Sequence, residues 1–350
     1  MPKTNALPSE SELQAMICLL DDTDQEVVEE VSKALLLRGP LVVPFLESAW
    51  IGDLPLIARE RIEELIHQIQ WNQCKEALLA WNLGDQEDLL TALIWIARIR
   101  YPDLDESELR NRLESLRIEI WMEMNPCMTA LEKVRVINHV LFKIHGYRGN
   151  TANYNDPQNS CLNKVLESRR GNPIVLCCIY MWLATKMEMP VVGVNLPQHF
   201  ILAYLDDVTE EISAPKALFY INAFNKGMVF GEKEIERFLE LIHLPANPRY
   251  FRPCTHHDIV IRVLNNLIHG YSESGKQEAS KELVELRDVL VEENPWRTLH
   301  PDDQTTPNTE RNPGSEDADR HDPNDMDPGD MDPGDMDPGD KDPNGFSDFD

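Results

Sequence analysis

The sequence has few basic residues for its length. Its 350 residues include 33 lysines and arginines against 61 aspartates and glutamates, which gives a formal net charge of −28 at pH 7. A surplus of negative charge disfavours binding to nucleic-acid phosphates and to anionic membranes. The sequence also contains no glycine-rich phosphate-binding loop and no paired-carboxylate signature. We therefore expect neither nucleic acid nor membrane as a partner.

Disulfide and metal frameworks are missing as well. The seven cysteines have no framework spacing and Met1-Pro2-Lys3 begins no secretory signal, so a cytoplasmic protein without disulfides is expected. Cys254-x-His256-His257 lacks a second ligand pair at zinc-like spacing, so Thr255 is predicted to cap a helix there. Neither a metal nor another cofactor is predicted. The most apolar helix, Ile174 to Met187, is shorter than the roughly 20 residues of a membrane span.

Two regions flank a central domain. Residues 1–84 are predicted to form an α-helical, HEAT-like lobe, because the helical theme of residues 22–50, broken at Gly39-Pro40, recurs over residues 53–81. A generic helical bundle is the alternative for this lobe. Residues 295–350 include three copies of Met-Asp-Pro-Gly-Asp, and from Pro301 onward there are 17 acidic and 3 basic residues. Such composition predicts a disordered acidic tail, suited to solubility or to adaptable interactions.

The central region alternates a helical and an extended pattern. Arg169-Arg170-Gly171 is predicted to end a short helix, with the glycine in a left-handed C-cap, and Asn172 to cap the next helix, with Pro173 in its first turn. Strands are predicted at Val191–Val194, Phe200–Tyr204 and Phe219–Asn222, and His199 lies at the start of the second. Papain-like folds bring a nucleophile, a base and an orienting residue together in this way.

Several short motifs carry a resemblance to the SirB-type family of transglutaminase-like bacterial proteins, over about residues 85 to 290. They are Asn138-x-x-Leu141-Phe142, Gly146-Tyr147-Arg148-Gly149-Asn150, Tyr154-x-Asp156-Pro157-x-Asn159-Ser160, Arg169-Arg170-Gly171-x-Pro173-Ile174 and Leu196-Pro197-x-His199-Phe200. The resemblance implies an α+β fold: a papain/transglutaminase-like core at residues 85–245, in which a central helix packs on antiparallel strands. A tetratricopeptide-like helical hairpin at residues 246–294 would follow, docked on the core or on a partner.

The resemblance also implies a nucleophile at the start of the central helix, a histidine on the next strand and an aspartate on the strand after that. His199 matches the histidine, whereas Asn222 stands where the family has aspartate. Asparagine can orient an imidazole but cannot stabilise imidazolium with a full charge. Val175 and Cys177 occupy the two positions where the family shows small hydroxyl residues, and valine cannot act as a nucleophile.

Cys177 and Cys178 allow two interpretations. A thiol near a helix N-terminus and a histidine can have a lowered pKa and react as thiolate. Both cysteines, however, lie inside an apolar run, and free cysteine is among the most buried residue types. The loop from Gly146 to Ser160 also allows two interpretations. Its polar groups either contact a peptide-like ligand or form hydrogen bonds with the loop's own backbone.

Two functions remain after these observations. The first, which Val175 and Asn222 favour, is a transglutaminase-like protein with a degenerate catalytic site, a scaffold with a protein or peptide partner. The alternative is a cysteine-dependent peptidase or acyltransferase in which Cys177 attacks, His199 is the base and Asn222 orients it. The oligomeric state is left open.

Overall fold

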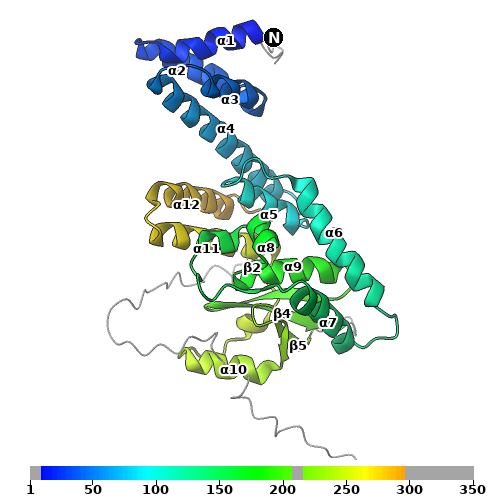
Figure 1. Cartoon of the computed structure of the whole chain (residues 1–350). Coiled ribbons are helices and arrows are strands. Elements are labelled where there is room, and N and C mark those ends of the chain that lie inside the picture. The colour runs from blue at the N-terminus through cyan, green and yellow to red at the C-terminus, as the bar shows by residue number, and fades with distance from the viewer. Residues whose placement is uncertain (1–8, 207–215, 296–350) are drawn as a thin grey trace, which may run out of the picture. The chain divides into compact units, whose positions relative to one another are not determined.

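The computed structural model, which describes residues 9–206 and 216–295, contains a four-stranded antiparallel sheet (Figure 1). The strands neighbour one another in chain order, and their bounds are β3 Val191–Leu196, β4 His199–Leu205, β5 Ala217–Asn222 and β6 Met228–Phe230. The predicted combination of helices with antiparallel strands is confirmed. The short strand β6 has no counterpart in the sequence-based prediction.

Most of the described chain is helical. The α-helices are α1 Glu10–Cys18, α2 Gln25–Leu36, α3 Val43–Ile51, α4 Leu56–Leu83, α5 Leu89–Arg98, α6 Glu106–Glu123, α7 Ala130–Asn138, α8 Leu162–Ser168, α9 Pro173–Lys186, α10 Glu232–Leu241, α11 His256–Glu273 and α12 Gln277–Glu292. Shorter helical turns are η1 Leu19–Asp21, η2 Gly39–Val42, η4 Pro157–Ser160 and η5 Pro248–Phe251, and the π-helix η3 His139–Ile144 continues α7.

Helix α9 is the centre of the largest core. Its residues Pro173 to Met181 are all buried, and it packs on β3 and β4. Asn172 caps it as predicted, because its side chain accepts a hydrogen bond from the Val175 backbone N–H. Helices α5, α6, α7 and α11 also contribute buried apolar side chains to this core. A helix that is apolar on all sides needs such neighbours on all sides.

Both faces of the sheet are covered. Phe200, Leu202 and Tyr204 of β4 belong to the core around α9, whereas Ile201 and Ala203 pack with α10 on the opposite face. Since side chains alternate along a strand, burial of both faces requires an apolar residue at every position. This explains the uninterrupted run Phe200–Tyr204.

The N-terminal helices α1 to α3 form a second apolar cluster with the first half of α4. Helix α4 continues without a break from Leu56 to Leu83, and its last turns join the core around α9. The predicted second unit, residues 53–81, therefore contains a single helix that begins at Leu56 and does not repeat the helix-break-helix theme of residues 22–50. The helical character of the N-terminal region is as predicted.

Helices α11 and α12 pack against each other as a hairpin, which contacts the core. Helix α11 packs against α5 and α9, and α12 contacts α4, where His67 Nε2 lies 2.8 Å from Glu282 Oε1. The side chain of Thr255 accepts a hydrogen bond from the Asp258 N–H, which confirms the predicted cap.

The end of α8 differs from its prediction. Arg169, with φ +60°, takes the left-handed conformation that we expected at Gly171. Gly171 instead lies in a short strand, β2 Arg170–Gly171, which pairs in parallel with β1 Arg148–Gly149. A Cβ atom at Gly171 would lie 2.8 Å from Val165 Cγ1, so the glycine is needed for close packing.

Among the described residues, no single helix has both the length and the apolarity to cross a membrane; only the pair Gln25–Leu36 and Gly39–Ile51, bent by 112°, satisfies that test together. The predicted acidic tail lies outside the described residues, apart from Pro295.

The packing of β1 leads to a first prediction. A Cβ atom at Gly149 would lie 2.5 Å from the Phe224 ring, so we expect Gly149→Ala to lower the free energy of unfolding by about 1–3 kcal/mol, measured by urea denaturation. Thr151→Ala, an exposed change two residues away, serves as the control and should have little effect. A Gly149→Ala protein as stable as the native protein would contradict the account of this contact.

Candidate functional site

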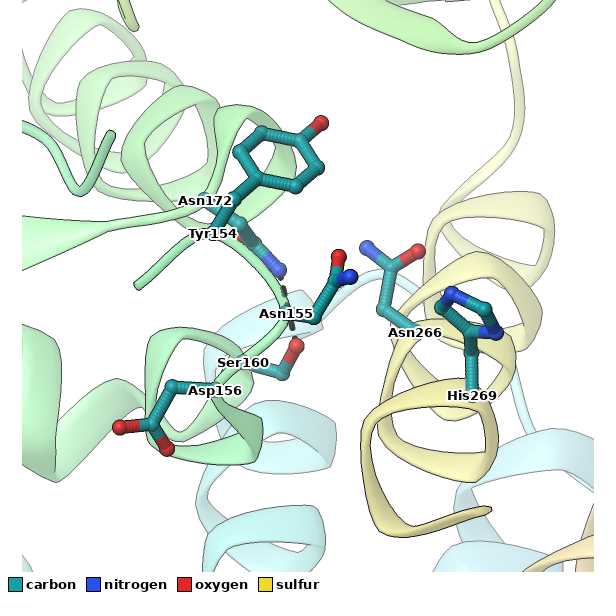
Figure 2. A pocket seen from close by; sticks show the side chains of 7 residues that line it. All are labelled: Tyr154, Asn155, Asp156, Ser160, Asn172, Asn266 and His269. Carbon is teal, nitrogen blue, oxygen red and sulfur yellow. Dashed lines mark hydrogen bonds between the residues drawn. The ribbon is translucent and has the colours of Figure 1, made fainter. Parts of the chain in front are cut away.

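The start of α9, where the resemblance places a nucleophile, holds no reactive side chain. Val175 is completely buried, and its backbone N–H donates to Asn172 Oδ1 over 3.0 Å. Asn172 Nδ2 in turn donates to Ser160 Oγ over 2.8 Å, as the dashed line in Figure 2 shows. These two bonds fix the helix start against the loop before α8.

Cys177 lies deeper in the same helix and has an exposed fraction of 0%. Its Sγ donates a weak hydrogen bond to the Phe200 carbonyl oxygen at 3.6 Å. Burial raises the pKa of the Cys177 thiol far above its usual range, although a hydrogen bond from the Ala223 backbone lowers it in part. Burial likewise raises the pKa of Cys178 well above normal. Neutral thiols are therefore the stable forms, and they are poor nucleophiles.

The structure brings His199 and Asn222 together. His199 is the first residue of β4, Asn222 is the last of β5, and their side chains are hydrogen-bonded. Burial and, secondarily, the charge of Arg262 lower the pKa of His199 to about 4, while the bond to Asn222 opposes this shift. The imidazole is consequently neutral at pH 7 and can serve as a hydrogen-bonding group.

Arg262 is a site residue that the sequence analysis missed. It projects from α11, and its Nη1 donates to the Leu196 carbonyl oxygen over 2.7 Å and to the side chain of Asn195. The hairpin thereby adds a cation to the surroundings of His199. Its signal in the sequence is that it is the single charged residue within the run from Ile259 to Leu264.

A polar cavity of about 70 Å³ adjoins this region between the loop before α8, the start of α9 and α11 (Figure 2). Its lining residues carry hydroxyl, amide, imidazole or carboxylate groups: Tyr154, Asn155, Asp156, Ser160, Asn172, Asn266 and His269. Tyr154 packs edge-on against Phe224, two residues after Asn222, with ring centroids 6.0 Å apart. Asn266 is one helical turn beyond Arg262. Tyr154 and Asn266 thus connect the cavity lining with the segments that carry Asn222 and Arg262.

The loop that lines this cavity is braced by its own amides. Asn159 Nδ2 donates to the carbonyl oxygens of Asn153 and Tyr154 at 2.6 and 3.0 Å, and Asn159 Oδ1 accepts from Asn150 Nδ2 at 2.8 Å. The loop's side chains therefore form hydrogen bonds with its own backbone, and the cavity that remains is lined by donors and acceptors and by no cysteine. Such an arrangement suits binding of a small polar group better than covalent chemistry.

The Cys254, His256 and His257 fragment has structural contacts. His256 Nδ1 lies 2.8 Å from the Gln86 carbonyl oxygen, and His257 Nε2 lies 3.3 Å from that of Leu290. Within residues 9–206 and 216–295 no group of three His, Cys, Asp or Glu side chains is arranged to hold a metal ion.

Comparisons with known proteins support the predicted transglutaminase-like core. Residues 107–265 match the model of the Transglutaminase-like superfamily. A UPF0162 protein of Xylella fastidiosa is 28% identical over 226 residues, which is 61% of this chain and 78% of that protein. UPF0162 protein YchA of Escherichia coli is 24% identical over 56% of this chain and 68% of its own. Human F-box only protein 21 is 31% identical over 29% of this chain and 16% of its own. No solved structure matches.

The lowered pKa of His199 leads to a prediction for pH. Because the unfolded histidine, with its usual pKa of 6.5, binds a proton that the folded one does not, the free energy of unfolding should fall as the pH drops from about 6.5 to about 4. Between pH 7 and pH 5 this component amounts to about 1–2 kcal/mol. It should be lost in His199→Gln and kept in His269→Gln, an exposed histidine, in urea denaturation series. Equal pH dependence in native protein and His199→Gln would contradict the shift.

Proposed function

We propose that this chain is a SirB-type transglutaminase-like protein whose core has a degenerate catalytic site and which acts by binding a protein or peptide partner in the cytoplasm. The observation that carries the proposal is the position of Cys177: its sulfur is completely buried in the α9 core, and burial raises its pKa far above the usual range. Val175 at the helix start offers no substitute, so the core contains no accessible nucleophile at the expected place.

Three features support binding as the remaining role. The cavity lined by the loop before α8, Asn172 and α11 presents polar groups at the junction of the core and the hairpin. The hairpin itself reaches the site through Arg262. In addition, Leu37, Ile51 and Leu56 in the N-terminal helices are exposed by 81%, 79% and 74%. Where such side chains lie together in one contiguous patch, they mark a protein interaction surface.

The second candidate is a cysteine-dependent peptidase or acyltransferase. It is favoured by the hydrogen bond between His199 and Asn222 and by the Ala223 backbone contact to Cys177, which would help to hold a thiolate. In that case Cys177 would attack an amide carbonyl, with His199 accepting the thiol proton. This candidate requires α9 to move, because the sulfur has no access to solvent in the described conformation.

The labelling rate of individual cysteines distinguishes these functions. With a small electrophile between pH 5 and pH 9, we expect Cys18 and Cys127, which are exposed, to react, while Cys177 stays unlabelled until urea unfolds the protein. Peptide mass spectrometry reports each site separately, so the exposed cysteines are internal controls. Fast labelling of Cys177 at low pH that slows in His199→Ala would establish a thiolate-imidazole pair and the second candidate.

A further inference from the structure

Two arginines face each other on the short parallel ladder before α9. In the pairing of β1 with β2, Arg148 lies opposite Arg170. The Arg148 N–H donates to the Arg169 carbonyl oxygen over 3.0 Å, and the Asn150 N–H donates to that of Gly171 over 3.0 Å. The backbone positions of both arginines are thus fixed by hydrogen bonds on either side of the pair.

Their side chains project from the outer face of this ladder. Cβ atoms at Gly149 and Gly171 would clash with Phe224 and Val165, at 2.5 and 2.8 Å, so the glycine face is packed against the core. Successive residues of a strand point to opposite faces, and neighbouring strands lie about 4.8 Å apart. Arg148 and Arg170 therefore project side by side, and both are exposed.

The structure provides this pair with no counter-charge. Across residues 9–206 and 216–295, no ion pair includes Arg148, Arg169 or Arg170, and Arg169 Nη1 donates to the His145 carbonyl oxygen over 2.9 Å. Two carboxylates of adjoining elements are already occupied, since Glu167 pairs with Lys164 and Glu119 with His145, each at 2.7 Å.

An uncompensated arginine pair is unusual in so acidic a chain. Like charges directly opposite one another in a sheet are destabilising. The sequence has 61 acidic residues against 33 basic ones, and yet within residues 9–206 and 216–295 no carboxylate forms an ion pair with these two. A ligand that supplies the missing negative charge would remove the repulsion, because each guanidinium offers a fork of donors that matches an oxyanion.

We propose that Arg148 and Arg170 together form a docking site for one oxyanion carried by a partner peptide, either an Asp or Glu carboxylate or a phosphorylated side chain. A single oxyanion needs only the local field of the pair, whereas a long polyanion such as nucleic acid meets the net charge of −28. The docking site does not depend on whether the Cys177 thiol is reactive.

Fluorescence anisotropy with the full chain tests the docking site. The probes are three short labelled peptides of the same uncharged background, carrying glutamates, one phosphoserine or only glutamines, at about 0.15 M salt, where the Debye length is about 8 Å. We expect the glutamate or the phosphoserine peptide to bind, and Arg148→Gln or Arg170→Gln to weaken that binding about tenfold. Lys233→Gln on α10, an exposed lysine that forms no ion pair with any described residue, removes the same charge elsewhere and should change affinity less than about twofold.

The outcomes separate the sources of the oxyanion. If only the phosphoserine peptide binds, the docked oxyanion is a phosphate. If the glutamate peptide binds, the docked oxyanion is a carboxylate. Either result supports the docking site. Failure of both peptides to bind, or unchanged binding to the double variant, overturns it. The melting temperature of the double variant provides a second measurement, because removal of a like-charge pair should leave it unchanged or higher. A lower melting temperature would assign the arginines a structural role and overturn the proposal.

Discussion

The burial of α9 on all sides is the constraint on which the rest of this structure depends. A helix with no polar face has to be enclosed, and here the sheet, α5, α6, α7 and α11 enclose it. The sheet in turn needs α10 on its other face, which makes β4 apolar at every position between its ends. The same enclosure places the hairpin next to His199, because α11 is one of the helices that cover α9.

This enclosure also determines the chemistry of the site. Removal of water disfavours charge on either partner: it raises the pKa of the Cys177 thiol and lowers that of the His199 imidazole. A thiolate-imidazolium pair would therefore have to offset two desolvation costs at once, and Asn222 contributes no full charge to help. The polar cavity, by contrast, is lined by hydroxyl, amide, imidazole and carboxylate groups, which can form hydrogen bonds to a ligand.

Much of this arrangement is predictable from sequence. Local signals were sufficient for α9, its Asn172 cap and the strands β3 to β5, because these depend on patterns within a few residues. The prediction of a left-handed residue at Gly171 was wrong. It assumed that the glycine was needed for its backbone conformation, whereas Gly171 allows close packing against Val165. Arg262 was missed because its role depends on a contact with Leu196, far away in the chain, which no local pattern encodes. The position of Arg148 opposite Arg170 was likewise not predictable, because it depends on how their two strands pair.

The ionisation state of His199 tests the central claim most directly. An NMR titration of the ¹⁵N-labelled imidazole from pH 5 to pH 8 should show one neutral tautomer throughout, because burial lowers the pKa to about 4 and Asn222 bonds to the ring. A ring that is protonated at pH 7, and that loses this proton affinity in Cys177→Ala, would show a charged pair with the thiolate and contradict the account.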